Sequence, residues 1–325
     1  MDVMDVMDAI PADGLSFAMP LLIMAIGGIY CERGGVLMLA LEGLQGFGAF
    51  TGALSVVLCL PLLGAGSPCL VYIAMAGAMI GGMSFSLLHA LLCVRFKAQQ
   101  VISGMVINTL AMALTTFLTS VVNEALTSQV SNRFQIGASE RFTLPILSRI
   151  PIFGGFFRNM YPFELVILAV AFVSWHVLYK TRFGLRLRAC GENPHSLDAA
   201  GGNVGRTRVI AIMICGALAG LGGIFVAYSV SANFSPSIYM GYGYMAIAAM
   251  IFGNWKISPT FAVCMFFGLT KSAGYQICLW LGMTSNYTDL LLVIPYVVTL
   301  VLLVFFSKRN QPPRALGDPF DKGKR

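Results

Sequence analysis

Long apolar segments, separated by short polar ones, run through almost the whole chain. A helix needs about 20 apolar residues to cross the hydrocarbon core of a bilayer, and nine segments approach that length. The short alternating segments of a transmembrane β-barrel do not occur. The sequence therefore predicts an all-α, polytopic integral membrane bundle. Its predicted spans are 14–30, 36–60, 70–94, 101–122, 163–180, 208–230, 238–254, 258–281 and 287–306.

The composition excludes an ordinary soluble fold. Hydrophobic residues make up 57% of the 325 residues and charged residues only 11%, whereas a soluble domain carries about 25% charged residues. A single soluble core stops growing at about 250–300 residues, so it cannot hide this much apolar surface from water. The lipid bilayer is the solvent that fits this composition.

The positive charges predict an orientation. A nucleic-acid-binding protein gathers Lys and Arg on one polar face, but here the cations form short clusters between apolar runs, which excludes a nucleic-acid partner. The positive-inside rule then predicts a cytoplasmic C-terminus, with sixteen of the 21 cations in cytoplasmic segments. Nine spans place the acidic N-terminus outside, and its lack of cations excludes a cleavable signal peptide.

These assignments divide the chain into two parts. Residues 1–307 form the transmembrane domain, with an outer loop at 123–162 and a cytoplasmic loop at 181–207. Residues 308–325 form a basic cytoplasmic tail.

The sequence offers no pattern of a metal, disulfide or catalytic site. The eight cysteines lack CxxC spacing and a neighbouring histidine cluster, so buried free thiols are the better interpretation. The stretch 268–272 is not a phosphate-binding loop, because Thr270 stands where a second glycine is required. We expect this chain to bind no metal or cofactor and to hydrolyse no ATP unaided.

Three polar residues within predicted spans are functional candidates, because polar groups are costly in lipid. Glu42 either lines a cavity where adjacent glycines thin the helix, or reaches the cytoplasmic interface or Arg33. Lys271 either belongs to a pathway or extends its long side chain to the outer interface, which is the favoured interpretation. Asn108 either lines a path or bonds a neighbouring helix, and bonding is slightly favoured.

Several spans carry small residues at the spacing that lets helices pack closely in lipid. The three GxxxG pairs are Gly48 with Gly52, Gly77 with Gly81, and Gly216 with Gly220. Together they predict a tight multi-helix bundle, although they identify no function.

The loop at 180–208 contains a predicted short helix. Pro194 is suited to a first helical position, the stretch 196–200 favours a helix, and Gly201 with Gly202 ends it. Cations flank this helix, so it could contact anionic lipid or dock into a partner protein.

Residues in this loop resemble a known family. The segments 184–194, GLRLRACGENP, and 199–204, AAGGNV, are similar to a signature of bacterial ABC-importer permeases of the branched-chain amino acid, ribose and nucleoside type. The match looks closest to the nucleoside-type permeases. Further similar stretches, in chain order, are 27–28, 32–36, 41–43, 101–104 with Asn108, 216–223, 246–253 and 315–321.

The resemblance implies a mechanism and partners. The chain would form half of a translocation pathway that works by alternating access, without catalysis of its own. Its partners would be an ABC ATPase with two fused cassettes that bind ATP and Mg²⁺, a second permease subunit and a substrate-binding lipoprotein. The candidate pathway residues are Glu42, Gln45, Phe47, Asn108 and Lys271. The implied ATPase-coupling residues are Glu192, Asp198, Ala199, Ala200 and Gly201.

The sequence also departs from the family pattern. Cys31 stands where a serine is usual, the run 37–40 lacks the usual asparagine, and Lys271 replaces an acidic or neutral residue. The substrate therefore stays open between a purine nucleoside, riboflavin and a simple sugar. For a flat purine or flavin ring, the aromatic residues that could provide stacking surfaces are Phe47, Phe50, Tyr242 and Tyr244. A secondary transporter is the alternative from another class, but it would require repeated broken helices and paired intramembrane charges.

Overall fold

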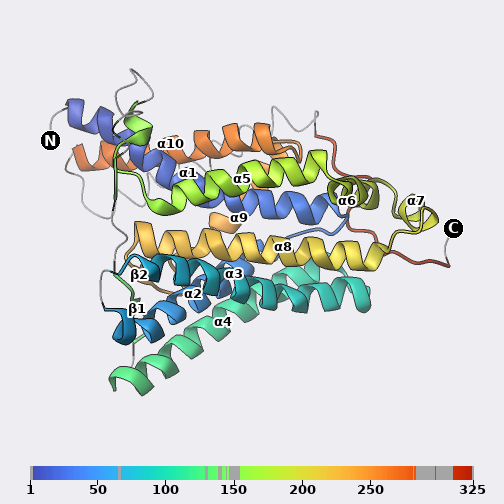
Figure 1. Ribbon diagram of the computed structural model, residues 1–325, viewed down its shortest axis with the longest axis horizontal. Coiled ribbons are helices and arrows are strands. Elements are labelled where there is room, and N and C mark those ends of the chain that lie inside the picture. The colour runs from blue at the N-terminus through green and yellow to red at the C-terminus, as the bar shows by residue number, and fades with distance from the viewer. Residues whose placement is uncertain are drawn as a thin grey trace.

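The computed structural model describes residues 3–64, 67–128, 131–137, 141–143, 154–280 and 310–323, together with residues 145, 282 and 297. Its long helices run along one axis of the molecule (Figure 1). One end, here called the α7 end, carries α6, α7 and the C-terminal segment, and the opposite end carries β1, β2 and the N-terminus (Figure 1).

Ten α-helices are described. They are α1 (Val3–Arg33), α2 (Leu41–Leu63), α3 (Cys69–Ala90), α4 (Gln100–Thr127), α5 (Pro162–Lys180), α6 (Arg182–Glu192), α7 (Pro194–Ala199), α8 (Val204–Phe225), α9 (Tyr242–Phe252) and α10 (Ile257–Trp280). Single π-helical turns extend α3 over Leu91–Arg95 and α8 over Val226–Val230, and a short 3₁₀ helix covers Gly154–Phe157. Strands β1 (Phe134–Gln135) and β2 (Asn233–Phe234) pair antiparallel, with Phe134 opposite Phe234.

Six described helices are long and apolar enough to cross a membrane. They cover Ala9–Arg33, Leu41–Leu63, Cys69–Arg95, Gln100–Leu126, Pro162–Lys180 and Val204–Val230, and they coincide with the first six predicted spans. The chain is thus a multi-pass membrane bundle, as its composition predicts.

The remaining three predicted spans have different outcomes. At the predicted span 238–254, α9 has only 11 residues, which is about 16 Å of helix, too short to cross the bilayer. The predicted span 258–281 coincides with α10, which is not among the six. The predicted span 287–306 lies outside the described residues, apart from residue 297. The total of nine spans stays a prediction.

Two helices form the centre of the bundle. In the apolar windows of the spans, 94% of α1 and 78% of extended α8 are buried, against 28% for α4 and for α5. A helix that is apolar on all sides can occupy such a central position. α1 packs against α8 and α10, while α2 packs against α3 and α8. The outer surfaces of α4 and α5 are left to lipid or to another protein.

Glycines bring α2, α3 and α8 into backbone contact. A side chain added at Gly220 would overlap the carbonyl oxygen of Ala78, and one added at Gly48 would overlap the Cα of Gly220. Gly216 of α8 likewise faces the backbone of Gly82 in α3. The tight packing predicted from the GxxxG pairs is therefore confirmed in these three helices.

Candidate functional site

Glu42 lies in the first turn of α2 and binds the first turn of α9. Its Oε1 accepts the N–H of Gly241, and its Oε2 accepts the N–H of Gly243 at 2.8 Å. The first N–H groups of a helix have no partner within the helix and form its positive end. Only 9% of Glu42 is exposed. Glu42 thus caps α9 inside the bundle and does not pair with Arg33, which instead lies 3.6 Å from Glu192.

Asn108 of α4 joins the same place from another side. Its Oδ1 accepts the N–H of Gly43 at 2.8 Å, and its Nδ2 donates to the carbonyl of Leu39 at 2.9 Å and to the hydroxyl of Tyr244 at 3.2 Å. The interpretation of Asn108 as a residue that bonds a neighbouring helix is confirmed. Asn108 also holds the hydroxyl of Tyr244, a residue that is 52% exposed.

Lys271 of α10 points to α9 as well. Its Nζ donates to the hydroxyl of Tyr242 at 2.5 Å and lies 4.9 Å from the centre of the Phe17 ring. An ammonium at such distances from aromatic faces is attracted by their negative electrostatic potential. Lys271 therefore contacts two neighbouring helices, and its extension to the outer interface stays a prediction. Its aromatic partners on α1 and α9 hold it against the protein.

Gln45 and Phe47 lie farther along α2. Gln45 is fully buried, and among the described residues its amide nitrogen and oxygen find no hydrogen-bond partner. Phe47 stacks on Phe85 of α3 with ring centres 4.3 Å apart. The structure therefore brings Glu42, Asn108 and Lys271 together around the first turn of α9, and it places Gln45 and Phe47 outside that group.

Phe17 and Tyr239 complete this region, and sequence reasoning did not single them out. Tyr239 fills the space beside Gly46, where any side chain would overlap its ring. Its hydroxyl lies 3.5 Å from that of Thr115. Neither residue carries a local signal, because aromatic residues are common in membrane helices and these partners are remote in sequence.

The short helix predicted in the loop is confirmed as α7 (Pro194–Ala199). The Asn193 side chain caps it by accepting the N–H groups of His195 and Ser196 at 3.1 and 3.2 Å, and Pro194 occupies the first turn. Gly201 follows in the left-handed conformation, with a φ of 79°, which favours glycine at the end of a helix. Ala199, Ala200 and Gly201 are exposed.

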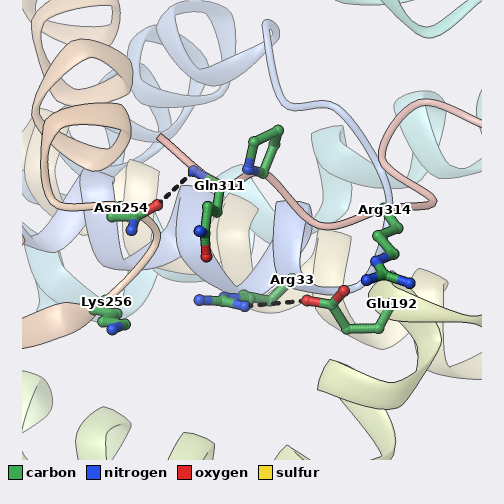
Figure 2. Close-up of a pocket in the computed structure, with 7 residues that line it drawn as sticks. Arg33, Glu192, Asn254, Lys256, Gln311 and Arg314 are labelled. Atoms are coloured by element: carbon green, nitrogen blue, oxygen red, sulfur yellow. Dashed lines mark hydrogen bonds and ion pairs between the residues drawn. The ribbon is translucent and has the colours of Figure 1, made fainter. Parts of the chain in front are cut away.

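A polar cavity of about 590 Å³ lies at the α7 end (Figure 2). Arg33 is held in it by a 3.1 Å hydrogen bond from Nε to the carbonyl of Trp255 and by Glu192. The C-terminal segment forms one side of the cavity, where the backbone N–H of Gln311 donates to Asn254 at 2.9 Å. The lining residues are Arg33, Glu192, Asn254, Lys256, Gln311, Pro312 and Arg314.

Comparisons with known proteins identify the family of this chain. Residues 10–305 match the model of the family described as branched-chain amino acid transport system / permease component. The chain is 36% identical over 330 residues to the guanosine ABC transporter permease protein NupQ of Bacillus subtilis, covering 100% of both chains. It is 37% identical over 329 residues to the nucleoside ABC transporter permease protein NupC of Lactococcus lactis, again covering 100% of both chains.

A second B. subtilis protein is also similar. The guanosine ABC transporter permease protein NupP is 25% identical over 224 residues, which cover 68% of this chain and 62% of NupP. No solved structure matches the chain. The family model spans all six membrane helices and the α6–α7 segment. The chain is a multi-pass protein of the bacterial inner membrane, and it belongs to the family of permease components of branched-chain amino acid transport systems.

Proposed function

We propose that this chain is a permease subunit of an ABC importer and forms half of the pathway for a nucleoside. The observation that carries the proposal is the similarity along the full chain to two relatives named for guanosine and nucleoside transport. The chain supplies a path through the membrane, and a separate ATPase hydrolyses ATP.

The first turn of α9 is the proposed wall of that path. Tyr244 presents an exposed aromatic ring, and its hydroxyl is bonded to the Asn108 amide. An aromatic face beside polar groups suits a nucleobase, which is flat, apolar on its faces and rich in hydrogen-bonding groups at its edge. Glu42 and Lys271 fix this turn from the other sides, so their proposed role is to position the wall.

The proposed partners are inferred from the relatives and from the proposal that this chain forms only half of the pathway. Two different B. subtilis permeases, each named for guanosine, resemble this chain, which supports a pair of unlike permease subunits. We assign an ATPase with two cassettes to the α7 end and a substrate-binding lipoprotein to the β1–β2 end. This assignment places the C-terminus in the cytoplasm and the N-terminus outside, in agreement with the positive-inside rule.

Transport by the intact complex tests this function. The complex is isolated from its host through an affinity tag on this chain and placed in liposomes with the lipoprotein outside. We expect uptake of radiolabelled guanosine only when ATP is sealed on the ATPase side, because nucleotide binding drives the change between inward-facing and outward-facing states.

Two results would contradict the proposal. Uptake of guanosine by this chain alone, driven by an ion gradient, would assign it to the secondary transporters. ATP-dependent uptake of ribose or riboflavin without uptake of guanosine would refute the nucleoside assignment.

A substitution at Ala200 tests the coupling role of α7. Ala200 is exposed at the end of this helix, and an arginine there would prevent close docking into an ATPase cleft. We expect Ala200→Arg to lower guanosine uptake about tenfold, which corresponds to about 1.4 kcal/mol, while the subunits still assemble. Uptake and ATP hydrolysis are measured together, and Ala200→Ser is the matched control. Wild-type uptake by Ala200→Arg would remove α7 from the coupling site.

A further inference from the structure

The C-terminal segment 311–323, here called the strap, crosses the whole α7 end (Figure 1). It begins beside the turn between α9 and α10, where the N–H of Gln311 donates to Asn254. It ends beside α7, where Lys322 lies 3.2 Å from Asp198. Segments that are more than 50 residues apart in sequence are thus joined by one extended piece of chain.

Three backbone contacts fix the middle of the strap. The N–H of Ala315 donates to the carbonyl of Gly191 at 2.9 Å, and the N–H of Gly317 donates to the carbonyl of Gly35 at 3.2 Å. Arg208 of α8 donates from Nη1 to the carbonyl of Asp318 at 2.8 Å. Arg208 is only 2% exposed, and a hydrogen bond from a charged donor is stronger than a neutral one. These contacts connect the strap to α6, to the loop after α1 and to α8.

Apolar packing attaches the strap directly to the α6–α7 segment. Phe320 packs on the buried cluster of Cys190, Leu197 and Val204. Its ring also lies 5.2 Å from the ring of His195, measured between centres. Leu197 and His195 belong to α7 itself. Phe320 therefore closes the small core beneath α7. Among the described residues, this core is separate from the main apolar core of the bundle.

Two ion pairs add smaller contributions. Lys322 pairs with Asp198, and Lys97 lies 3.4 Å from Asp321. All four side chains are at least 31% exposed, and exposed ion pairs contribute about 0–1 kcal/mol each. The backbone contacts and Phe320 must therefore hold most of the strap in place.

A helix of six residues is too short to transmit a displacement by itself, because isolated short helices are unstable in water. We propose that the strap is the positioning element that makes α7 rigid and conveys its displacement to the ends of α1, α8 and the α9–α10 turn. This inference rests on the proposed coupling role of α7. The strap acts through α7, and the cavity beneath residues 311–314 leaves that part of it room to shift.

Cys190 provides a native reporter of the strap. The thiol is buried in the cluster on which Phe320 packs, and it donates to the carbonyl of Gly34 at 3.3 Å. Burial raises the pKa of the Cys190 thiol, although Arg208 opposes part of that rise. The reactive thiolate is therefore scarce at neutral pH, and opening of the strap increases both access and the thiolate fraction.

The experiment uses Phe320→Ala in the reconstituted importer, with Asp318→Ala as the matched control. Asp318 contributes only its carbonyl to the contact with Arg208, so its side chain can be removed without loss of that contact. The first measurement is the rate at which maleimide labels Cys190 at pH 7, followed in the Cys190 peptide by mass spectrometry. The second is the number of guanosine molecules imported per ATP hydrolysed.

We expect Phe320→Ala to label Cys190 about tenfold faster, as local opening becomes easier, and to import at least about fivefold less guanosine per ATP. Asp318→Ala should match the wild type in both measurements. Unchanged labelling of Phe320→Ala would show that the strap does not close the core beneath α7. Faster labelling with an unchanged import ratio would show that the strap covers α7 without coupling it. Either result overturns the proposal.

Different results would refute the strap proposal and the proposed function on which it rests. If Ala200→Arg uncouples transport while Phe320→Ala does not, the coupling role of α7 stands and the strap proposal is refuted. If the wild-type complex imports no guanosine, the nucleoside proposal is refuted and the labelling rates still measure the strap. A chain that ends at residue 310 should uncouple at least as strongly as Phe320→Ala, and wild-type coupling in that chain would also refute the proposal.

Discussion

Replacing Gly220 with leucine should prevent this protein from assembling into a stable bundle. Gly220 is the point where α8 touches α3 and α2, and a Cβ there would overlap the backbone of Ala78. Overpacking of a core costs about 1–3 kcal/mol when side chains can yield. Here the obstacle is backbone, so two helices must separate, and we expect the larger part of the folding stability to be lost.

The measurement is the fraction of monodisperse protein in detergent and its midpoint of thermal unfolding. Gly220→Ala should already lower the midpoint, because the Cβ alone causes the overlap. Gly205→Ala is the matched control in the same helix, since a Cβ there meets only Asn203 at 3.6 Å and Val94 at 3.7 Å. A wild-type midpoint for Gly220→Leu would show that the three helices do not pack through their backbones.

Replacing Glu42 with alanine should have the second largest effect. The change leaves the N–H groups of Gly241 and Gly243 without their acceptor inside the bundle. An unsatisfied buried donor costs about 1–3 kcal/mol, and the favourable interaction of the carboxylate with the positive end of α9 is lost as well. We expect α9 to loosen, so that both thermal stability and guanosine uptake fall.

Glu42→Gln separates capping from charge. A glutamine retains one carbonyl oxygen as acceptor. We therefore expect the unfolding midpoint and the uptake rate of Glu42→Gln to lie between those of the wild type and those of Glu42→Ala. An uptake loss in Glu42→Ala at an unchanged midpoint would instead indicate direct contact with substrate. Wild-type values of both quantities would exclude the capping role.

Local chemistry made part of this protein predictable from its sequence. Length and apolarity identified six helices that the structure contains. Pro194 and Gly201 marked the two ends of α7, because proline suits the first turn of a helix and glycine suits the left-handed residue after it. The close approach of α8 to its neighbours followed from the glycine spacing. For the six helices and α7, the signal and the structure occupy the same stretch of chain. For the glycines, the spacing predicts a close approach but does not name the partner helix.

The remaining features depend on partners that are far apart in the chain. Glu42 was conspicuous as a charge in an apolar run, but its acceptor role involves Gly241, which is 199 residues away. Lys271 likewise finds its aromatic partners, Phe17 and Tyr242, on other helices, so its contacts have no local sequence signal. The strap has no apolar periodicity, so its position on α7 could not be read from residues 311–323.

The backbone contacts among α2, α3 and α8 also restrict how this subunit can change shape. Side chains that interlock can adopt new rotamers, but touching backbones permit only one distance of closest approach. We expect these three helices to move together as one body when the pathway opens and closes. Distances between reporter probes placed within this trio should stay constant through the transport cycle, so informative probe pairs need one member on α4 or α5, where exposure is greatest.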